Sequence, residues 1–236
     1  MPLSYSQLQC YRRCPKQYEF AFVKKVPRAI SMGESFGSSI HLALKKWGEL
    51  EASLAPKNPA GQIALFTEEP HGSDRKLDLT TLKTLWRQSF VSQGYESRAA
   101  QDSALLQGDH ALEHFFRWWL TEKREVAACE KGFTVDLPAS ADKPAVSIAG
   151  RFDRVERTEK GLVVVDFKSG QPRDQQYVDT DLQLSIYAAA VQRIWNEPAA
   201  ELKLLFLGEE ELVERVTTRN PSQIADAMKI IRLLAD

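Results

Sequence analysis

The sequence predicts a mixed α/β fold of the α+β kind, in which a central sheet of four or five strands is flanked by helices. Three observations lead to this prediction. The first half of the chain is dominated by apolar residues at helical spacing, and three runs of strand character follow it. A helical segment then separates these runs from two more strands and a last helix. A chain of 236 residues can bury a substantial core as one domain with an insertion.

Helices are expected from the start of the chain. Ser4 and Ser6 are suitable N-caps for a first helix, and Pro15 marks a break or a new first turn. A second helix is predicted over residues 35–50. Its apolar stripe repeats at i, i+4 and i+7 and consists of Ile40, Leu44 and Trp47.

An insertion is expected between this second helix and the sheet. Prolines and glycines interrupt residues 53–77 without a period, which is typical of a loop. Helical pattern then runs over residues 79–127, with a break near Gln93 and Gly94. We therefore predict one domain over residues 1–236, with a helical insertion at about 53–128.

The strands are predicted in the second half of the chain. Apolar residues alternate around 133–137 and 146–152, and the run Val163–Val165 is β-branched. Lys160 and Gly161 suit the turn of a hairpin between the second and third strands. The remaining elements are a helix over about 179–196, strands over 202–207 and 212–216, and a last helix that begins at Pro221.

The charge of the chain is balanced overall but unevenly distributed. The net charge of −1 gives no general sign of nucleic-acid binding, but residues 1–30 are strongly basic. This basic segment is either a solvated helix face or a surface that attracts phosphates. It contains Arg12, Arg13, Lys16, Lys24, Lys25 and Arg28 against Glu19 alone.

No feature of the sequence predicts a membrane partner. No apolar run approaches the roughly 20 residues that a spanning helix needs, and Met1–Ser4 does not resemble a signal peptide. We therefore expect a soluble, cytoplasmic protein. Its three cysteines, Cys10, Cys14 and Cys129, do not form a disulfide framework.

Two short segments carry the predicted chemistry. Asp153 and Asp166 each lie at the edge of an apolar strand, and a hairpin can bring them to the same end of neighbouring strands. Two close carboxylates raise each other's pKa, and a hard divalent cation removes that conflict. Lys168 lies two residues after Asp166 and so shares its strand face. These residues suit metal-assisted cleavage of a phosphodiester, or else form a surface salt-bridge cluster.

Three helical side chains can complete such a site. His41 on the second helix can supply a neutral imidazole to a metal, although a lone helical histidine is more often structural. Gln183 and Tyr187 are one turn apart on a later helix and can hydrogen-bond the lysine, a metal-bound water or a phosphate. The alternative for Tyr187 is packing with its hydroxyl at the surface.

Together these pieces resemble the PD-(D/E)XK nuclease superfamily, in the branch of the RecB C-terminal nuclease domain, AddB and Cas4. The resemblance covers residues 3 to about 190. It rests on five pieces in the family's order, namely Leu3-Ser4-Tyr5-Ser6 with Cys14-Pro15, Gly37 to His41, Gly150 to Asp153, Asp166-Phe167-Lys168, and Gln183 to Tyr187. It implies a restriction-endonuclease-like core, a mixed central sheet flanked by helices.

The resemblance also implies roles for the residues. His41, Asp153, Asp166 and the backbone carbonyl of Phe167 would bind Mg²⁺ or Mn²⁺, Lys168 would be the catalytic lysine, and Gln183 and Tyr187 would support the site. Glu130 matches an acidic position of this branch. The implied activity is cleavage of DNA, single-stranded or at duplex ends, by an exonuclease of repair, recombination or defence. A catalytically silent DNA-binding or helicase-partner scaffold, and a hydrolase acting on RNA, remain open alternatives.

The chain departs from its relatives in its cysteines. Some members of this branch hold an iron–sulfur cluster with four thiolates, which three cysteines cannot supply. We therefore expect no cluster, and we expect Cys10 and Cys14 to pack as small apolar groups rather than to hold zinc. His110, Glu113 and His114 have metal-like spacing, but the aromatic residues beside them favour a packed helix. No phosphate-binding loop for ATP is present, so this chain has no ATP motor of its own, and it is either free-standing or part of a larger helicase–nuclease.

Overall fold

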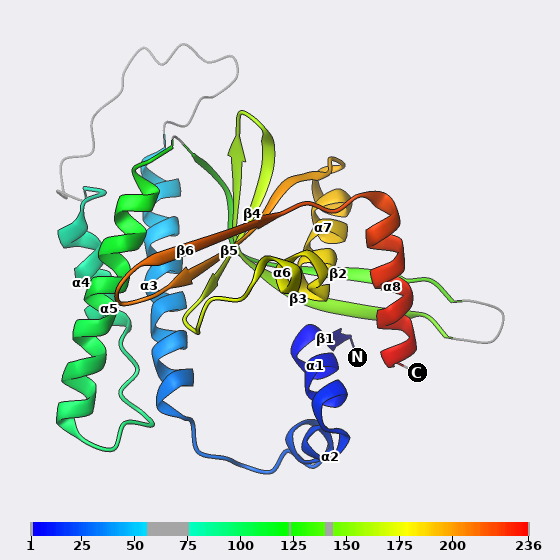
Figure 1. Cartoon of the computed structure of the whole chain (residues 1–236), viewed down its shortest axis with the longest axis horizontal. Helices are drawn as coiled ribbons and strands as arrows, with labels where there is room; N and C mark the ends of the chain where they lie inside the picture. Colours follow the sequence, from blue (N-terminus) through cyan, green and yellow to red (C-terminus); the bar gives the residue numbers. More distant parts are fainter. Residues whose placement is uncertain (1, 56–75, 123, 140–143, 236) are drawn as a thin grey trace.

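The computed structural model describes residues 2–55, 76–122, 124–139 and 144–235, and its centre is a mixed sheet of six strands (Figure 1). The strands are β1 (Leu3–Ser4), β2 (Glu125–Leu137), β3 (Val146–Thr158), β4 (Gly161–Lys168), β5 (Ala199–Leu207) and β6 (Leu212–Thr217). The order is β1-β3-β4-β5-β6, and β2 pairs with β3. The pairs β1–β3 and β4–β5 are parallel, and the others are antiparallel. The predicted mixed sheet is confirmed.

Strand β3 has two partners on one of its edges. β2 occupies the other edge from Val146 to Arg157. On the edge that β2 does not occupy, β1 pairs with Ile148 and Ala149, whereas β4 pairs with β3 from Arg154 onward. Residues 150–153 therefore have no ladder partner on this edge. Because side chains alternate along a strand, this gap leaves one backbone edge and every second side chain accessible between β1 and β4.

Helices cover both faces of the sheet (Figure 1). α3 (Met32–Leu54), α4 (Leu79–Ser89) and α5 (Arg98–Trp119) lie on one face, and α7 (Leu182–Trp195) and α8 (Pro221–Ala235) lie on the other. Alternate residues of β4 face the two layers: Val163, Val165 and Phe167 pack toward α3 and α5, while Leu162 and Val164 pack toward α7. This alternation is typical of a sheet buried on both faces.

The chain between β1 and α3 forms short helical pieces at the edge of the molecule. α1 (Tyr5–Arg13) begins at Ser4, whose side chain caps it, and α2 (Pro15–Tyr18) begins at the predicted break. A π-helical turn, η1 (Glu19–Val23), follows. None of the side chains of α2 or η1 is buried, so this basic segment is solvated.

Several predicted boundaries are wrong. β1 was not predicted, because two residues are too few to show a strand pattern. The helix predicted over about 179–196 is α7, which begins at Leu182 because the Asp181 side chain accepts from the backbone of Gln183 and Leu184 and caps it. The short helix α6 (Gln175–Thr180) before it was not predicted. β2 begins inside the predicted helical region 79–127, and α3 extends beyond residues 35–50 at both ends. Most of the loop predicted over 53–77 lies outside the described residues.

Other expectations are confirmed. β3 and β4 form a hairpin whose turn places Gly161 at φ +117°, a conformation that favours glycine. α8 begins at Pro221, and β5 and β6 form the last hairpin. The aromatic residues of α5 pack into the core beside α3 rather than facing solvent. Among the described helices, none combines the length and apolar composition that crossing a bilayer requires.

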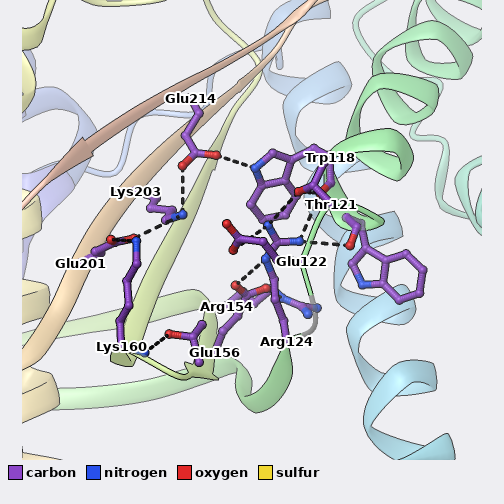
Figure 2. Close-up of polar contacts among 12 residues, drawn as sticks. Trp118, Thr121, Glu122, Arg124, Arg154, Glu156, Lys160, Glu201, Lys203 and Glu214 are labelled. Carbon is purple, nitrogen blue, oxygen red and sulfur yellow. Dashed lines mark hydrogen bonds and ion pairs between the residues drawn. The ribbon is translucent and has the colours of Figure 1, made fainter.

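A buried ion network joins Arg154 and Glu156 of β3 to Arg124 (Figure 2) and also connects β3 to α3. Arg154 is 2% exposed and makes two hydrogen bonds to Glu51 of α3, at 2.8 and 3.0 Å. Its Nε also donates to Glu156 at 2.6 Å, and Arg124 lies against the other oxygen of Glu156 at 3.3 Å. Because Arg154 is buried and both of its partners are acidic, the network is a specific clamp between helix and sheet.

We predict that Glu51→Ala lowers the free energy of unfolding by about 3 kcal/mol, because it leaves the guanidinium of Arg154 buried without its main partner. Urea unfolding of the metal-free protein measures this loss. The control is Lys45→Ala, which removes an exposed α3 ion pair with Glu49 and should change stability by less than about 1 kcal/mol. Equal losses in the two variants would contradict the clamp.

Candidate active site

An open cavity of about 590 Å³ lies at the gap in the pairing of β3. Its walls come from β1, α1, α3, β2, β3, β4 and α7, and its polar lining includes His41, Asp153, Asp166, Lys168 and Gln183. Five of the predicted site residues therefore meet in one place, and Tyr187 lines the same cavity. At its wall, Gly150 lets the ring of Phe133 pack so closely that a Cβ would lie 2.3 Å from it.

Asp153 occupies the point where β3 and β4 separate. The last residue pair of their ladder is Arg154 with Val165, so Asp153 and Asp166 follow it on the two diverging strands. One oxygen of Asp153 accepts from the backbone N–H of Phe167 at 2.9 Å. The other lies 3.3 Å from Nδ1 of His41. The predicted arrangement of the two acids at one end of neighbouring strands is thus found.

His41 reaches this point from the middle of α3. Gly37, one turn earlier, allows the helix to approach the end of β4, since a Cβ there would lie 2.9 Å from Oγ of Ser169. The imidazole packs edge-on against the ring of Phe167. Burial alone would lower the pKa of His41, but the hydrogen bond and negative charge of Asp153 outweigh it and raise the pKa.

Asp166 and Lys168 form the second half of the site. Asp166 is 2% exposed, and its Oδ2 lies 2.6 Å from Nζ of Lys168. Burial raises the pKa of Asp166 to about 6, with the charge of Asp153 adding to the rise and Lys168 opposing it. For Lys168, burial would lower the pKa, but the Asp166 charge prevails and raises it. Lys168 therefore carries its positive charge at neutral pH.

Gln183 and Tyr187 of α7 hold this pair in place. The Gln183 side chain accepts from Nζ of Lys168 at 3.1 Å and donates to the Tyr187 hydroxyl at 2.8 Å. The Tyr187 hydroxyl donates to Oδ1 of Asp166 at 2.9 Å. Burial and the nearby Asp166 raise the pKa of Tyr187, so the hydroxyl stays protonated and remains a donor. The alternative of a surface hydroxyl for Tyr187 is excluded.

Glu130 also belongs to the site and lies on β2, the strand that pairs with the other edge of β3. The neighbouring pairs Cys129 with Arg154 and Lys131 with Phe152 place it across from Asp153. Its φ of 49° is unusual for a residue other than glycine. Burial raises its pKa, and the charge of Arg151 opposes the rise. Donor atoms of Glu130, His41 and Asp153 all lie within 4.8 Å of one another.

The donors present fit a divalent cation. They are carboxylate oxygens and one imidazole nitrogen, which are ligands for Mg²⁺ and Mn²⁺. Oδ2 of Asp166 is buried, and its close polar neighbour is Nζ of Lys168 at 2.6 Å, so a cation bound by this carboxylate would lie beside the ammonium. Asp166 is not among the three residues of the close donor cluster, where Glu130 takes the third position.

The α5 histidines with metal-like spacing, and the cysteines, lie outside the candidate site. His110 and His114 contact Glu209, and Glu113 pairs with Lys83. Cys10, Cys14 and Cys129 are free thiols, and in the portion of the chain that is described no metal-binding group contains a cysteine. Cys10 is buried as expected, whereas Cys14 instead caps α2 by accepting from the backbone of Gln17.

Sequence reasoning assigned no role to two residues of the cavity. Arg151 lies two residues before Asp153 on β3, and its guanidinium contacts Glu130 at 2.6 Å. Alternation along the strand is the signal that could have placed it on the face of Asp153. Tyr5 lies at the other end of the cavity, 3.5 Å from Asp181. Its position depends on β1, which the sequence did not reveal.

Comparison with known proteins agrees with this geometry. The family model of the PD-(D/E)XK nuclease superfamily matches residues 2–236. Gene 69 protein of Mycobacterium phage D29 is 25% identical over 213 residues, which cover 84% of this chain and 72% of that protein. A crystal structure from Eubacterium rectale, described provisionally as an exonuclease, aligns over 98% of this chain and 77% of its own, with a TM-score of 0.50 and 9% identity. That likeness supports the fold alone. The structure of SSO0001 aligns over 67% of this chain and 66% of its own, with 14% identity and a TM-score of 0.34, which is too low to indicate a shared fold.

We predict that the affinity for Mn²⁺ falls as the pH is lowered through about 6. Protons on Asp166 and His41 compete with the cation, and affinity then changes by about tenfold per pH unit for each proton displaced. The same shift of Asp166 means that the cation-free protein loses stability as the pH rises from 3.8 to about 6, where the unfolded chain has released this proton and the folded one has not.

Calorimetric titration with Mn²⁺ at pH 7.5 and 5.5 measures this dependence. The control is Asp166→Asn, which should bind Mn²⁺ more weakly at pH 7.5 and show a shallower dependence on pH. A wild-type affinity that is the same at both pH values would contradict the prediction.

Proposed function

Because the chain belongs to the PD-(D/E)XK nuclease superfamily, we propose that it is a metal-dependent DNA nuclease that hydrolyses phosphodiester bonds as an exonuclease. The observation that carries the proposal is the convergence at the fork of β3 and β4, where Asp153, Asp166, Lys168 and His41 line one open cavity. Nuclease chemistry needs acids for a cation and a positive charge for the phosphate, and this cavity offers both.

The proposed cation ligands are His41, Asp153, Asp166 and the backbone carbonyl of Phe167, with Glu130 as a further carboxylate. When bound, Mg²⁺ or Mn²⁺ supplies polarisation of the phosphate and activation of a water. The backbone amide of Phe167 and the imidazole of His41 hold the Asp153 carboxylate in position for the cation.

Lys168 is proposed as the catalytic lysine. Its charge is maintained by Asp166, so it acts as a cationic donor that orients water and stabilises negative charge on a phosphoryl oxygen, rather than as a base. Gln183 fixes the ammonium and Tyr187 fixes the carboxylate. The hydrogen bonds from α7 thus set the separation between the cation site and the amine.

The finer assignments follow from the resemblance. We propose that residues 1–236 form one nuclease domain of the RecB, AddB and Cas4 branch, without an iron–sulfur cluster, and that its partner is a helicase. The Eubacterium rectale protein, which shares the fold, is itself described provisionally as an exonuclease, and we propose the same class of activity for this chain. The basic segment before α3, with Lys24 and Lys25 exposed, supports attraction of phosphates.

We predict that Lys168→Ala and Asp166→Ala each lower cleavage at least about 10²-fold, because the first removes the positive charge beside the reacting phosphate and the second removes a proposed ligand of the cation. The assay uses end-labelled single- and double-stranded DNA, linear and circular, with Mg²⁺ and with Mn²⁺. An exonuclease should degrade linear DNA and leave circles intact.

The matched control is Lys83→Ala, which removes a lysine paired with Glu113 outside the cavity and should leave cleavage unchanged. Circular dichroism verifies that all variants fold. If the wild-type protein cuts no DNA with either metal, or the site variants cut as well as the control, the nuclease proposal is wrong. DNA binding without cleavage would then favour the silent scaffold.

A further inference from the structure

The ion pair between Arg151 and Glu130 lies where two cavities meet. The second cavity, of about 520 Å³, follows the first half of α3 past Gly33, Ser38 and Lys45. Both cavities are lined by His41 and Arg151. A substrate strand that spans them must therefore pass the guanidinium of Arg151 and the cation site together.

Arg151 is anchored by its backbone, while its side chain is largely exposed. It pairs with Gly132 of β2 but has no ladder partner on the other edge of β3, and it lies two residues from Asp153 on the same strand face. Its carbonyl oxygen lies 3.2 Å from the Tyr187 hydroxyl, while its side chain is 66% exposed. The guanidinium can therefore turn without disturbing the strand.

Glu130 has two competing uses. Its side chain is 11% exposed and pairs with Arg151 at 2.6 Å, yet it also belongs to the donor cluster with His41 and Asp153. Its backbone has a φ of 49°, a left-handed conformation that is costly for a residue other than glycine. The pair with Arg151 does not by itself account for this strain.

We propose that Arg151 binds the substrate phosphate next to the cation, and that Glu130 couples this contact to cation binding. The inference rests on the proposed nuclease function. A cation held by Glu130, His41 and Asp153 places two positive charges near the guanidinium and weakens its attraction to the shared carboxylate. Arg151 then turns into the cavity, where its planar donors match a phosphate in a bidentate manner.

The test measures DNA binding with the Lys168→Ala protein as parent, so that the DNA stays intact. Fluorescence anisotropy of a labelled single-stranded oligonucleotide is recorded in EDTA and in Mn²⁺. We expect Mn²⁺ to strengthen binding by the parent, and we expect adding Arg151→Ala to remove about tenfold of the affinity in Mn²⁺. Arg151→Lys should recover only part of it, because an ammonium cannot bind in a bidentate manner.

Glu130→Gln tests the coupling. It should free Arg151 and so strengthen DNA binding in EDTA, while calorimetry should show weaker Mn²⁺ binding than in the parent. The matched control is Arg157→Ala on the same strand, which removes a pair with Glu197 outside both cavities and should leave both measurements unchanged.

Three results would overturn the proposal. They are an absence of Mn²⁺-dependent DNA binding in the parent, equal DNA affinity of the parent and the Arg151→Ala protein in Mn²⁺, or unchanged Mn²⁺ affinity after Glu130→Gln. Failure of the nuclease proposal is seen separately, as an absence of DNA cleavage by the wild-type protein in Mn²⁺. The role of Arg151 is therefore judged by binding alone.

Discussion

The site depends on the incomplete pairing of β3. β2 holds one edge of this strand over nearly its whole length, so β1 and β4 must share the other edge. Neither reaches residues 150–153, and the cavity opens there. If β3 were paired along its whole length, Asp153 and Asp166 would lie side by side without room for a ligand. Ionising two carboxylates that lie so close together is unfavourable. The divergence of β3 from β4 instead gives them room for a shared ligand.

Two consecutive residues of β3 contact α3. Asp153 lines the cavity beside His41, and the next residue, Arg154, binds Glu51 further along the same helix. The helix that carries His41 is thus clamped to the strand that carries Asp153. The buried network around Arg154 and Glu156, which Figure 2 shows in part, therefore helps to hold this helix on the strand.

Much of the site could be predicted because its determinants are local. The hairpin of β3 and β4 has a short turn at Gly161, and a short turn sets the register that brings Asp153 beside Asp166. The spacing of Gln183 and Tyr187 needs only one helical turn. The position of Glu130 was less accessible, since its φ of 49° depends on the irregular pairing of β2 with β3. The contact between Arg151 and Glu130 likewise joins two strands.

The sequence by itself determined the order of helices and strands, the hairpin turns and the residue types of a cation and phosphate site, because these follow from periodicity and from spacing within one element. Only the tertiary structure decided that β1 lines the cavity and that Arg151 and Glu130 meet beside His41. These features depend on contacts between segments far apart in the chain, whose free energy is set by packing and burial and leaves no periodic trace in the sequence.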